Sequence, residues 1–304
     1  MRILMTGGTG FIGQALVREL LAASHSLTIL VRDYAAARVK LGAGPELVRN
    51  LDELGQDEHF DAVINLAGEG IAAKRWTAAR KKVLMNSRLD TTREVIQLLQ
   101  RLDHKPECLI NASAVGYYGT ERDRPLTERD SGGSGFSHEL CKRWEDEARK
   151  AESLGVRVCL MRFGVVLGAG GGMLARLLPF YRFWLGGRLG HGEQMLSWIH
   201  RTDLINALQW VLQDHEQTGV FNVTAPHPVS NRQFNDTLSD LLRRPAVFHQ
   251  PPAMVLLMFG EMGDQLLLKG QQVLPARLEH AGFTFQYPEI HGALQACLCD
   301  LGLN

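Results

Sequence analysis

The first thirteen residues constrain the fold more than any other stretch of this chain. An apolar run from Ile3 to Met5 predicts a strand, a glycine-rich turn follows it at once, and residues 14–22 predict a helix. Gly8, Gly10 and Gly13 have the spacing G-x-G-x-x-G. Such glycines permit a tight turn, a close approach of the backbone to a pyrophosphate, and close packing of helix on strand. Because strand, turn and helix coincide, the stretch predicts a dinucleotide site with the phosphates at the helix N-terminus.

Predicted strands and helices alternate through the first half of the chain. Strands are expected at 27–31, 61–66, 108–113 and 156–161, and helices at 86–102 and 136–153. This pattern is typical of an α/β protein with a doubly wound parallel (Rossmann) sheet. We expect that domain at 1–172, with 193–225 returning to it, and a smaller α/β C-terminal domain at 173–304. The last part of that domain, residues 250–304, is expected to be helical.

The composition narrows the partners and the compartment. The 304 residues are 45% hydrophobic and 22% charged, with a formal net charge of +0. This balance gives no electrostatic case for nucleic acid or a membrane as partner. Five cysteines without a C-x-x-C pair predict neither a disulfide framework nor a metal site. Without a signal-peptide pattern or an apolar stretch of about 18–20 residues, we expect a cytoplasmic protein.

The residue after the second predicted strand bears on the choice of cofactor. A carboxylate at the end of this strand favours NAD through the ribose 2′-OH, whereas an arginine favours NADP by pairing with a 2′-phosphate. Arg32 follows the strand 27–31 directly, so the sequence predicts NADP. Asp33 is a competing candidate one residue further on, and Arg32 as a solvated loop charge is the other alternative.

Further cofactor contacts are predicted at the ends of neighbouring strands. The turn and the first helix are expected to hold the pyrophosphate through Gly7, Thr9, Gly10, Phe11, Ile12 and Gly13. Leu66, Ala67 and Gly68 follow the strand that begins at Asp61, and the small residues there would let the backbone approach the adenosine half. Arg88 either reaches a phosphate or is an exposed helical arginine.

Together these segments resemble the extended short-chain dehydrogenase/reductases of the NAD-dependent epimerase/dehydratase superfamily. Residues 6–13 match the pattern T-G-G-x-G-F-I-G, 65–68 match N-x-A-G, and 198–203 are similar to [FW]-[IV]-H-x-x-D. Segments 65–69 and 113–119, with Gly260-Glu261, resemble one atypical, YfcH-like "epimerase family" subfamily. The resemblance implies an NADP-binding Rossmann domain and a small C-terminal domain particular to that group.

The resemblance also implies where the catalytic groups lie. The superfamily uses a tyrosine, a lysine four residues later that holds the nicotinamide ribose, and a serine or threonine. Lys142 matches the lysine, but the residue four positions earlier is His138. Counting back from Tyr118 puts the usual serine at Ala114, with Ser113 one residue earlier and therefore on the opposite face of the strand.

Three interpretations of this departure remain open. In the first, His138 or Tyr117 replaces the tyrosine, assisted by Lys142 and Ser113, in an NADP(H)-dependent oxidoreductase or nucleotide-sugar-epimerase-like enzyme. Its reaction would be hydride transfer on a small hydroxyl or carbonyl substrate. In the second, catalysis is lost and the chain is an NADP(H)-binding regulatory or partner-binding protein. In the third, His138 and Lys142 are surface residues of their helix and the acid lies in the second half of the chain, for example at His200. Dimerisation of two copies of the chain is compatible with all three.

Overall fold

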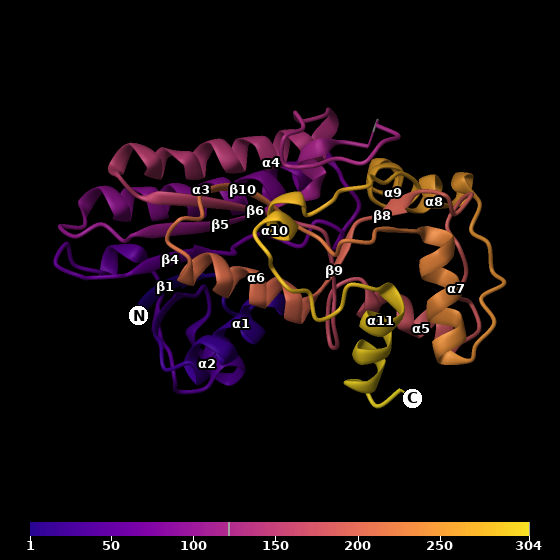
Figure 1. The fold of residues 1–304 in the computed structure, drawn as a ribbon, viewed down its shortest axis with the longest axis horizontal. Coiled ribbons are helices and arrows are strands. Elements are labelled where there is room, and N and C mark those ends of the chain that lie inside the picture. The colour runs from indigo at the N-terminus through magenta and orange to yellow at the C-terminus, as the bar shows by residue number, and fades with distance from the viewer. Residues whose placement is uncertain (121, 304) are drawn as a thin grey trace.

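The apolar runs of the first half pair into one parallel sheet (Figure 1). The computed structural model describes residues 1–120 and 122–303. Among these, the sheet has seven strands in the order β10 (Gly219–Val223), β6 (Arg157–Phe163), β5 (Cys108–Ala114), β4 (Ala62–Asn65), β1 (Arg2–Thr6), β2 (Ser26–Leu30) and β3 (Glu46–Val48). The chain builds outward from β1 to β3 and then crosses to β4 on the other side. The carboxyl ends of β1 and β4 therefore form the crevice in which ligands of such sheets bind.

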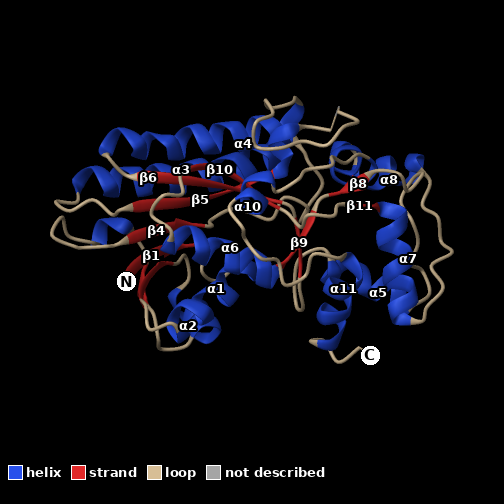
Figure 2. Ribbon diagram, in the orientation of Figure 1, coloured by secondary structure: helices blue, strands red, loops and turns tan. Residues whose placement is uncertain are grey.

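Helices cover both faces of the sheet because its strands are apolar on both sides. Along β1, Ile3 and Met5 face one core and Leu4 faces the other, and all three are fully buried. The helices α1 (Phe11–Ala22), α2 (Tyr34–Leu41) and α6 (Arg201–Gln213) lie on one side, and α3 (Ala78–Arg101) and α4 (Gly135–Ala148) lie on the other (Figure 2). The predicted doubly wound fold is confirmed.

The rest of the chain builds a smaller, mainly helical region beside the sheet. Its elements are β7 (Val165–Leu167), α5 (Leu174–Arg182), β8 (Met195–Leu196), β9 (Trp198–His200), β11 (Val229–Ser230), α7 (Asn231–Leu242), α8 (Pro252–Phe259), α9 (Glu261–Gly263), α10 (Ala276–His280) and α11 (Ile290–Cys299). Strands β7 and β9 form a short parallel pair, and β8 and β11 an antiparallel one. Trp198 and Leu294 are fully buried in the core of this region. Two elements from this half of the chain belong to the large domain instead: β10 is a strand of the seven-stranded sheet, and α6 packs on one face of that sheet.

Several helices differ in length from the prediction, for local reasons. Helix α3 begins at Ala78 rather than near 86, because the Thr77 side chain caps it by accepting from the Arg80 N–H. The segment 250–304, predicted to be helical, is interrupted at Gly260, whose φ is +58°. Four tight helical turns complete the secondary structure: 3₁₀ turns at Leu51–Glu53 (η1), Val115–Tyr118 (η2) and Arg149–Leu154 (η3), and a π-helical turn at Asp264–Leu268 (η4).

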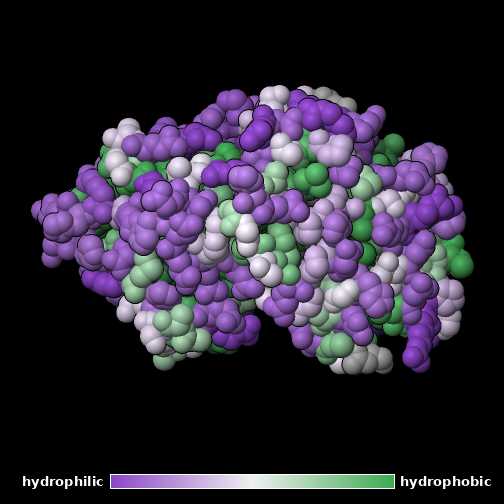
Figure 3. Space-filling view, viewed as in Figure 1, coloured by the Kyte–Doolittle hydropathy of each residue, from purple (hydrophilic) through white to green (hydrophobic). Residues whose placement is uncertain are grey.

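The surface is mostly polar on the face drawn in Figure 3, where a notch separates the tip of α2 from α11. Exposed apolar side chains gather on and before α8, among them Phe248 and Leu257, and at the end of α5, among them Phe183 and Trp184. No helix within the described residues has the length and apolar character that a membrane span requires.

Candidate functional site

The turn between β1 and α1 can form only with glycine at two of its positions. Gly7 has a φ of +71°, in the left-handed region that favours glycine. A Cβ atom on Gly13 would lie 2.2 Å from the Gly7 carbonyl oxygen. The first turn of the helix therefore sits directly against the end of the strand.

The start of α1 fits a bound anion. Its N-cap is Gly10, no side chain caps it, and the first turn holds no acidic residue. The N–H groups at the start of a helix lack intrahelical acceptors and carry partial positive charge. Those of Phe11, Ile12 and Gly13 are therefore suited to the pyrophosphate of a dinucleotide, as the sequence predicts.

A buried polar network fixes the end of β4 beside this turn. The Thr6 hydroxyl donates to Asn65 Oδ1 at 2.6 Å and accepts from the Ala67 N–H at 3.1 Å. The Asn65 amide group in turn donates to Asn111 Oδ1 at 2.6 Å. A Cβ on Gly7 would lie 2.6 Å from the Leu66 carbonyl. The predicted Leu66–Gly68 segment thus lies against the glycine turn.

At the end of β2, Arg32 and Asp33 have different environments. The Asp33 side chain caps α2 by accepting from the Ala36 N–H at 3.0 Å. The Arg32 side chain is 93% exposed and makes one ion pair, with Glu69 Oε1 at 3.1 Å. Asp33 is therefore committed to its helix, and Arg32 is available to a ligand in the crevice.

Arg88 braces the turn after β4. Its guanidinium donates to the carbonyl oxygens of Glu69, at 3.2 Å, and Leu84, at 3.1 Å, and lies 5.0 Å from the centre of the Trp144 ring. Burial lowers the pKa of Arg88. The alternative of an exposed helical arginine is wrong, because packing and backbone acceptors hold the side chain in place.

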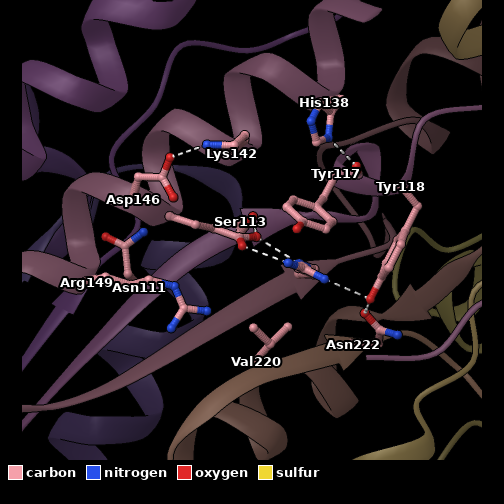
Figure 4. A network of polar contacts seen from close by, with 12 residues as sticks. Asn111, Ser113, Tyr117, Tyr118, His138, Lys142, Asp146, Arg149, Val220 and Asn222 are labelled. Atoms are coloured by element: carbon pink, nitrogen blue, oxygen red, sulfur yellow. Dashed lines mark hydrogen bonds and ion pairs between the residues drawn. The ribbon is translucent and has the colours of Figure 1, made fainter. Parts of the chain in front are cut away.

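Lys142, one of the predicted catalytic residues on α4, lies on the solvent side of the helix. Lys142 Nζ pairs with Asp146 at 2.7 Å, and both side chains are about half exposed (Figure 4). Successive residues of an α-helix are separated by about 100°, so Cys141, one position earlier, is buried. A Cβ on Gly116 of η2 would lie 3.1 Å from Ser137 Cβ and 3.7 Å from Cys141 Sγ. The face of α4 turned to the end of β5 thus carries Ser137 and Cys141, and not His138 and Lys142 as expected.

Ser113 also faces away from the crevice. Its hydroxyl is 2% exposed and donates to Glu145 Oε1 at 2.6 Å. Glu145 accepts twice from the Arg162 guanidinium of β6, at 2.8 and 2.7 Å. This is the orientation that alternation along the strand predicts for Ser113. It leaves Ser113 engaged with a buried ion pair.

The Glu145–Arg162 ion pair was missed from the sequence. Arg162 also donates to the Tyr118 hydroxyl at 2.9 Å, which donates to Asn222 Oδ1 at 2.8 Å. Burial lowers the pKa of Arg162, but the hydrogen bonds and charge of Glu145 outweigh it and raise that pKa. Burial raises the pKa of Tyr118 to about 12. An arginine inside the apolar run 156–163 was the signal in the sequence, since a buried arginine requires a partner.

Tyr117 and His138, the two candidate proton donors, lie side by side. Their ring centres are 5.3 Å apart, and His138 Nδ1 bonds the Tyr117 carbonyl oxygen at 2.6 Å. The Tyr117 ring also stacks 3.4 Å from the Arg162 guanidinium. Both side chains are half-buried. Of the four predicted catalytic residues, only these two are brought together.

His200, the third alternative, has a structural environment. It is buried at the end of β9, and its Nδ1 caps α6 by accepting from the Thr202 N–H at 3.2 Å. Burial lowers its pKa to about 4. His200 is therefore a neutral imidazole that caps a helix.

The C-terminal region covers the carboxyl edge of the sheet. The Gln271 side-chain amide donates to the Val115 carbonyl at 2.9 Å, and the Ser137 hydroxyl to Gln265 Oε1 at 3.4 Å. These contacts bring η4 and the segment after it against η2 and the start of α4.

Two known protein families match parts of this chain. Residues 3–224 match the family described as NAD dependent epimerase/dehydratase family. The chain belongs to that family. Residues 250–297 match a second family, a domain of unknown function named DUF1731. The resemblance inferred from the sequence is thereby confirmed.

Similar proteins carry the name "epimerase family protein". The chain is 41% identical over 292 residues to Epimerase family protein Mb2239 of Mycobacterium bovis, covering 96% of each chain. It is 39% identical over 306 residues to YfhF of Bacillus subtilis, covering 99% of each.

Among solved structures, human epimerase family protein SDR39U1 (isoform2) with NADPH matches with a TM-score of 0.88 and 35% identity, over 98% of this chain and 99% of that one. A UDP-galactose 4-epimerase matches with a TM-score of 0.77 at 18% identity over 99% of each chain, which shows the fold alone.

Proposed function

We propose that this protein binds NADP(H), with the adenosine 2′-phosphate on Arg32. The observation that carries this proposal is the contrast at the end of β2, where Asp33 caps a helix and Arg32 is exposed at the crevice. A planar guanidinium pairs well with a phosphate, whereas a carboxylate occupied by its own helix is a poor acceptor for a ribose 2′-OH. The NADPH in the human relative's structure supports the same cofactor.

The remaining contacts follow from the elements around the crevice. The N–H groups of Phe11, Ile12 and Gly13 would hold the pyrophosphate, since no side chain or acid competes for them. Leu66 to Gly68 would border the adenosine half, held in place by Asn65 and Arg88.

For the chemistry, we propose hydride transfer between the dinucleotide and a small carbonyl or hydroxyl substrate. The bound nicotinamide would supply or accept the hydride. The proton would pass through Tyr117, whose ring lies between Arg162 and His138 at the end of β5. His138, bonded to the Tyr117 carbonyl, would hold that segment and relay the proton. In this proposal Ser113 and Lys142 do not touch the substrate.

A second candidate is a regulatory protein that binds NADP(H) without turnover. One observation favours it. The face of α4 turned to β5 carries Ser137 and, four residues later, Cys141, where the superfamily has its tyrosine and lysine. Burial raises the pKa of the Cys141 thiol to about 11. A neutral thiol supplies no charge to activate a hydroxyl, so the usual proton-transfer pair is missing from that face.

Cofactor binding is tested by titrating NADPH and NADH into the wild type and Arg32→Ala. Loss of a charge-assisted phosphate contact predicts about a ten- to hundredfold weaker Kd for NADPH and a change of less than about threefold for NADH. Arg18→Ala on α1, also exposed, is the matched control. Equal losses for both dinucleotides would refute the assignment of Arg32.

The choice between catalysis and regulation needs a turnover assay. NADPH oxidation is followed across a panel of small carbonyl compounds with the wild type, Tyr117→Phe and Lys142→Ala. The enzyme proposal expects activity that Tyr117→Phe lowers by roughly 10²–10⁴-fold and Lys142→Ala leaves nearly unchanged. Tight NADPH binding without turnover of any compound favours the regulatory candidate.

A further inference from the structure

Two arginines from different elements converge on the Glu69 carboxylate at the mouth of the proposed 2′-phosphate site. Arg32 Nη1, after β2, lies 3.1 Å from Glu69 Oε1. Arg80, in the first turn of α3, has Nη1 and Nη2 both 3.4 Å from Glu69 Oε2. Each arginine therefore takes one oxygen of the same carboxylate, as two groups sharing a phosphate would.

Arg80 is built into this position. Its side chain is 12% exposed, and Nη2 donates to the Gly70 carbonyl at 2.8 Å. Its backbone N–H is fixed by the Thr77 cap. Its Nε is buried and has no hydrogen-bond partner among the described residues. The guanidinium is therefore fixed in place, and its long 3.4 Å contacts to Glu69 leave Nη1 and Nη2 able to donate to a further acceptor.

The Glu69 backbone is fixed as well, while its carboxylate is not buried. Its N–H donates to the Ser87 hydroxyl at 3.1 Å, and its carbonyl accepts from Arg88. The side chain is 30% exposed. A rotation about the side-chain bonds would move the carboxylate out of the crevice without disturbing the turn.

The charges around Glu69 are unbalanced. The hydrogen bond from Arg32 lowers the pKa of Glu69, so the carboxylate is ionised at neutral pH. It faces the guanidinium groups of Arg32 and Arg80, and Arg88 lies behind its backbone. One negative charge therefore meets three positive ones. A phosphate monoester, which carries about −1.5 to −2 charge at pH 7, balances this cluster better than a carboxylate does.

We propose that Glu69 occupies the place of the ribose 2′-phosphate in the free protein, and that Arg80 is a second arginine for that phosphate. On binding of an adenosine 2′-phosphate, Glu69 leaves and the phosphate takes both guanidinium groups. NADH, whose 2′-OH can donate to a carboxylate, binds with Glu69 in place. This inference rests on the proposed NADP(H) binding and adds the residues that set its selectivity.

The test measures the Kd of NADPH, NADH and adenosine 2′,5′-bisphosphate, which carries the phosphate without the nicotinamide. Arg80→Met is expected to weaken NADPH and the bisphosphate by roughly ten- to hundredfold and NADH by less than about threefold. Glu69→Gln removes the competing charge and is expected to tighten NADPH and the bisphosphate by about threefold or more and to weaken NADH. Arg93→Met, an exposed arginine further along α3, is the matched control.

Arg80→Lys is included because it keeps the positive charge and loses only the planar guanidinium, so it separates loss of the phosphate contact from misfolding. It is expected to weaken NADPH less than Arg80→Met does, with an unchanged melting temperature. The inference is overturned if both Arg80 variants bind NADPH like the control, or if Glu69→Gln weakens NADPH as much as NADH. A wild type that binds NADPH no better than NADH refutes the proposed cofactor preference itself.

Discussion

Replacing Glu145 by glutamine removes the charge that balances Arg162 inside the protein. The two side chains are 4% and 3% exposed and lie 2.7 Å apart, so little solvent can compensate for the lost charge. Breaking a buried ion pair from one side costs about 3–5 kcal/mol of folding free energy. Glutamine keeps one acceptor for Ser113 and Arg162 Nε, but its NH2 group replaces the oxygen that accepts from Arg162 Nη2, so a loss of at least about 3 kcal/mol is expected.

The next residue provides an internal control. Asp146 pairs with Lys142 at the same 2.7 Å separation, but both side chains are about half exposed. Solvent screening limits such a pair to less than about 1 kcal/mol. Glu145→Gln and Asp146→Asn thus make the same chemical change on neighbouring residues of α4 and differ in burial.

The assay is reversible urea unfolding at pH 7, followed by both tryptophan fluorescence and circular dichroism, whose transitions must coincide. Because Glu145 and Arg162 act as a unit, Glu145→Gln combined with Arg162→Met should lose less stability than the two single losses added together. The reasoning is refuted if Glu145→Gln loses less than about 1 kcal/mol, or if Asp146→Asn loses as much.

Three further predictions concern other parts of the molecule. The folded-state pKa of His200 lies near 4, below its ordinary 6.5, so the unfolded chain binds the proton first. The free energy of unfolding should therefore fall by about 3 kcal/mol through this residue as the pH drops from 6.5 to 4. In a pH series of unfolding free energies, His200→Asn should lack this fall. Gly13→Ala puts a Cβ 2.2 Å from the Gly7 carbonyl, so NADPH binding should fall at least about tenfold in a titration, with a lower melting temperature. Lys142→Ala should change stability by less than about 1 kcal/mol and the NADPH Kd by less than about threefold, and a larger effect on binding would return Lys142 to the cofactor site.

The sequence predicts the strand, glycine turn and helix at the start of the chain well because that unit is local. Gly7 to Gly13 form their turn within a few residues of β1 and α1, and their spacing is dictated by that turn alone. The segment after β4 follows from the same rule, since parallel strands end at one edge of the sheet. The pairing of Arg32 with Glu69 joins residues 37 apart in the sequence, and no local pattern shows it.

The buried network lay beyond the sequence for a related reason. Ser113, Glu145, Arg162, Tyr118 and Asn222 come from five different elements, and each alone reads as an ordinary strand, turn or helix residue. Their hydrogen bonds depend on how α4 and β10 pack on the sheet. An arginine in an apolar strand signals that a partner exists, without identifying it.

The outward position of Lys142 could have been predicted from the sequence, and it bears on the chemistry. Leu140, Cys141 and Trp144 are buried on α4, which defines the inner stripe of the helix, and Lys142 lies about 100° away from Cys141. The position of this stripe places Cys141, and not Lys142, on the inner face of α4. Burial raises the pKa of Cys141 and keeps its thiol neutral. On the inner face of α4, positions 137 and 141 therefore carry only two weak proton donors, the Ser137 hydroxyl and the neutral Cys141 thiol. If the protein catalyses hydride transfer, the proton has to come from the end of β5, where Tyr117 lies between a buried cation and an imidazole.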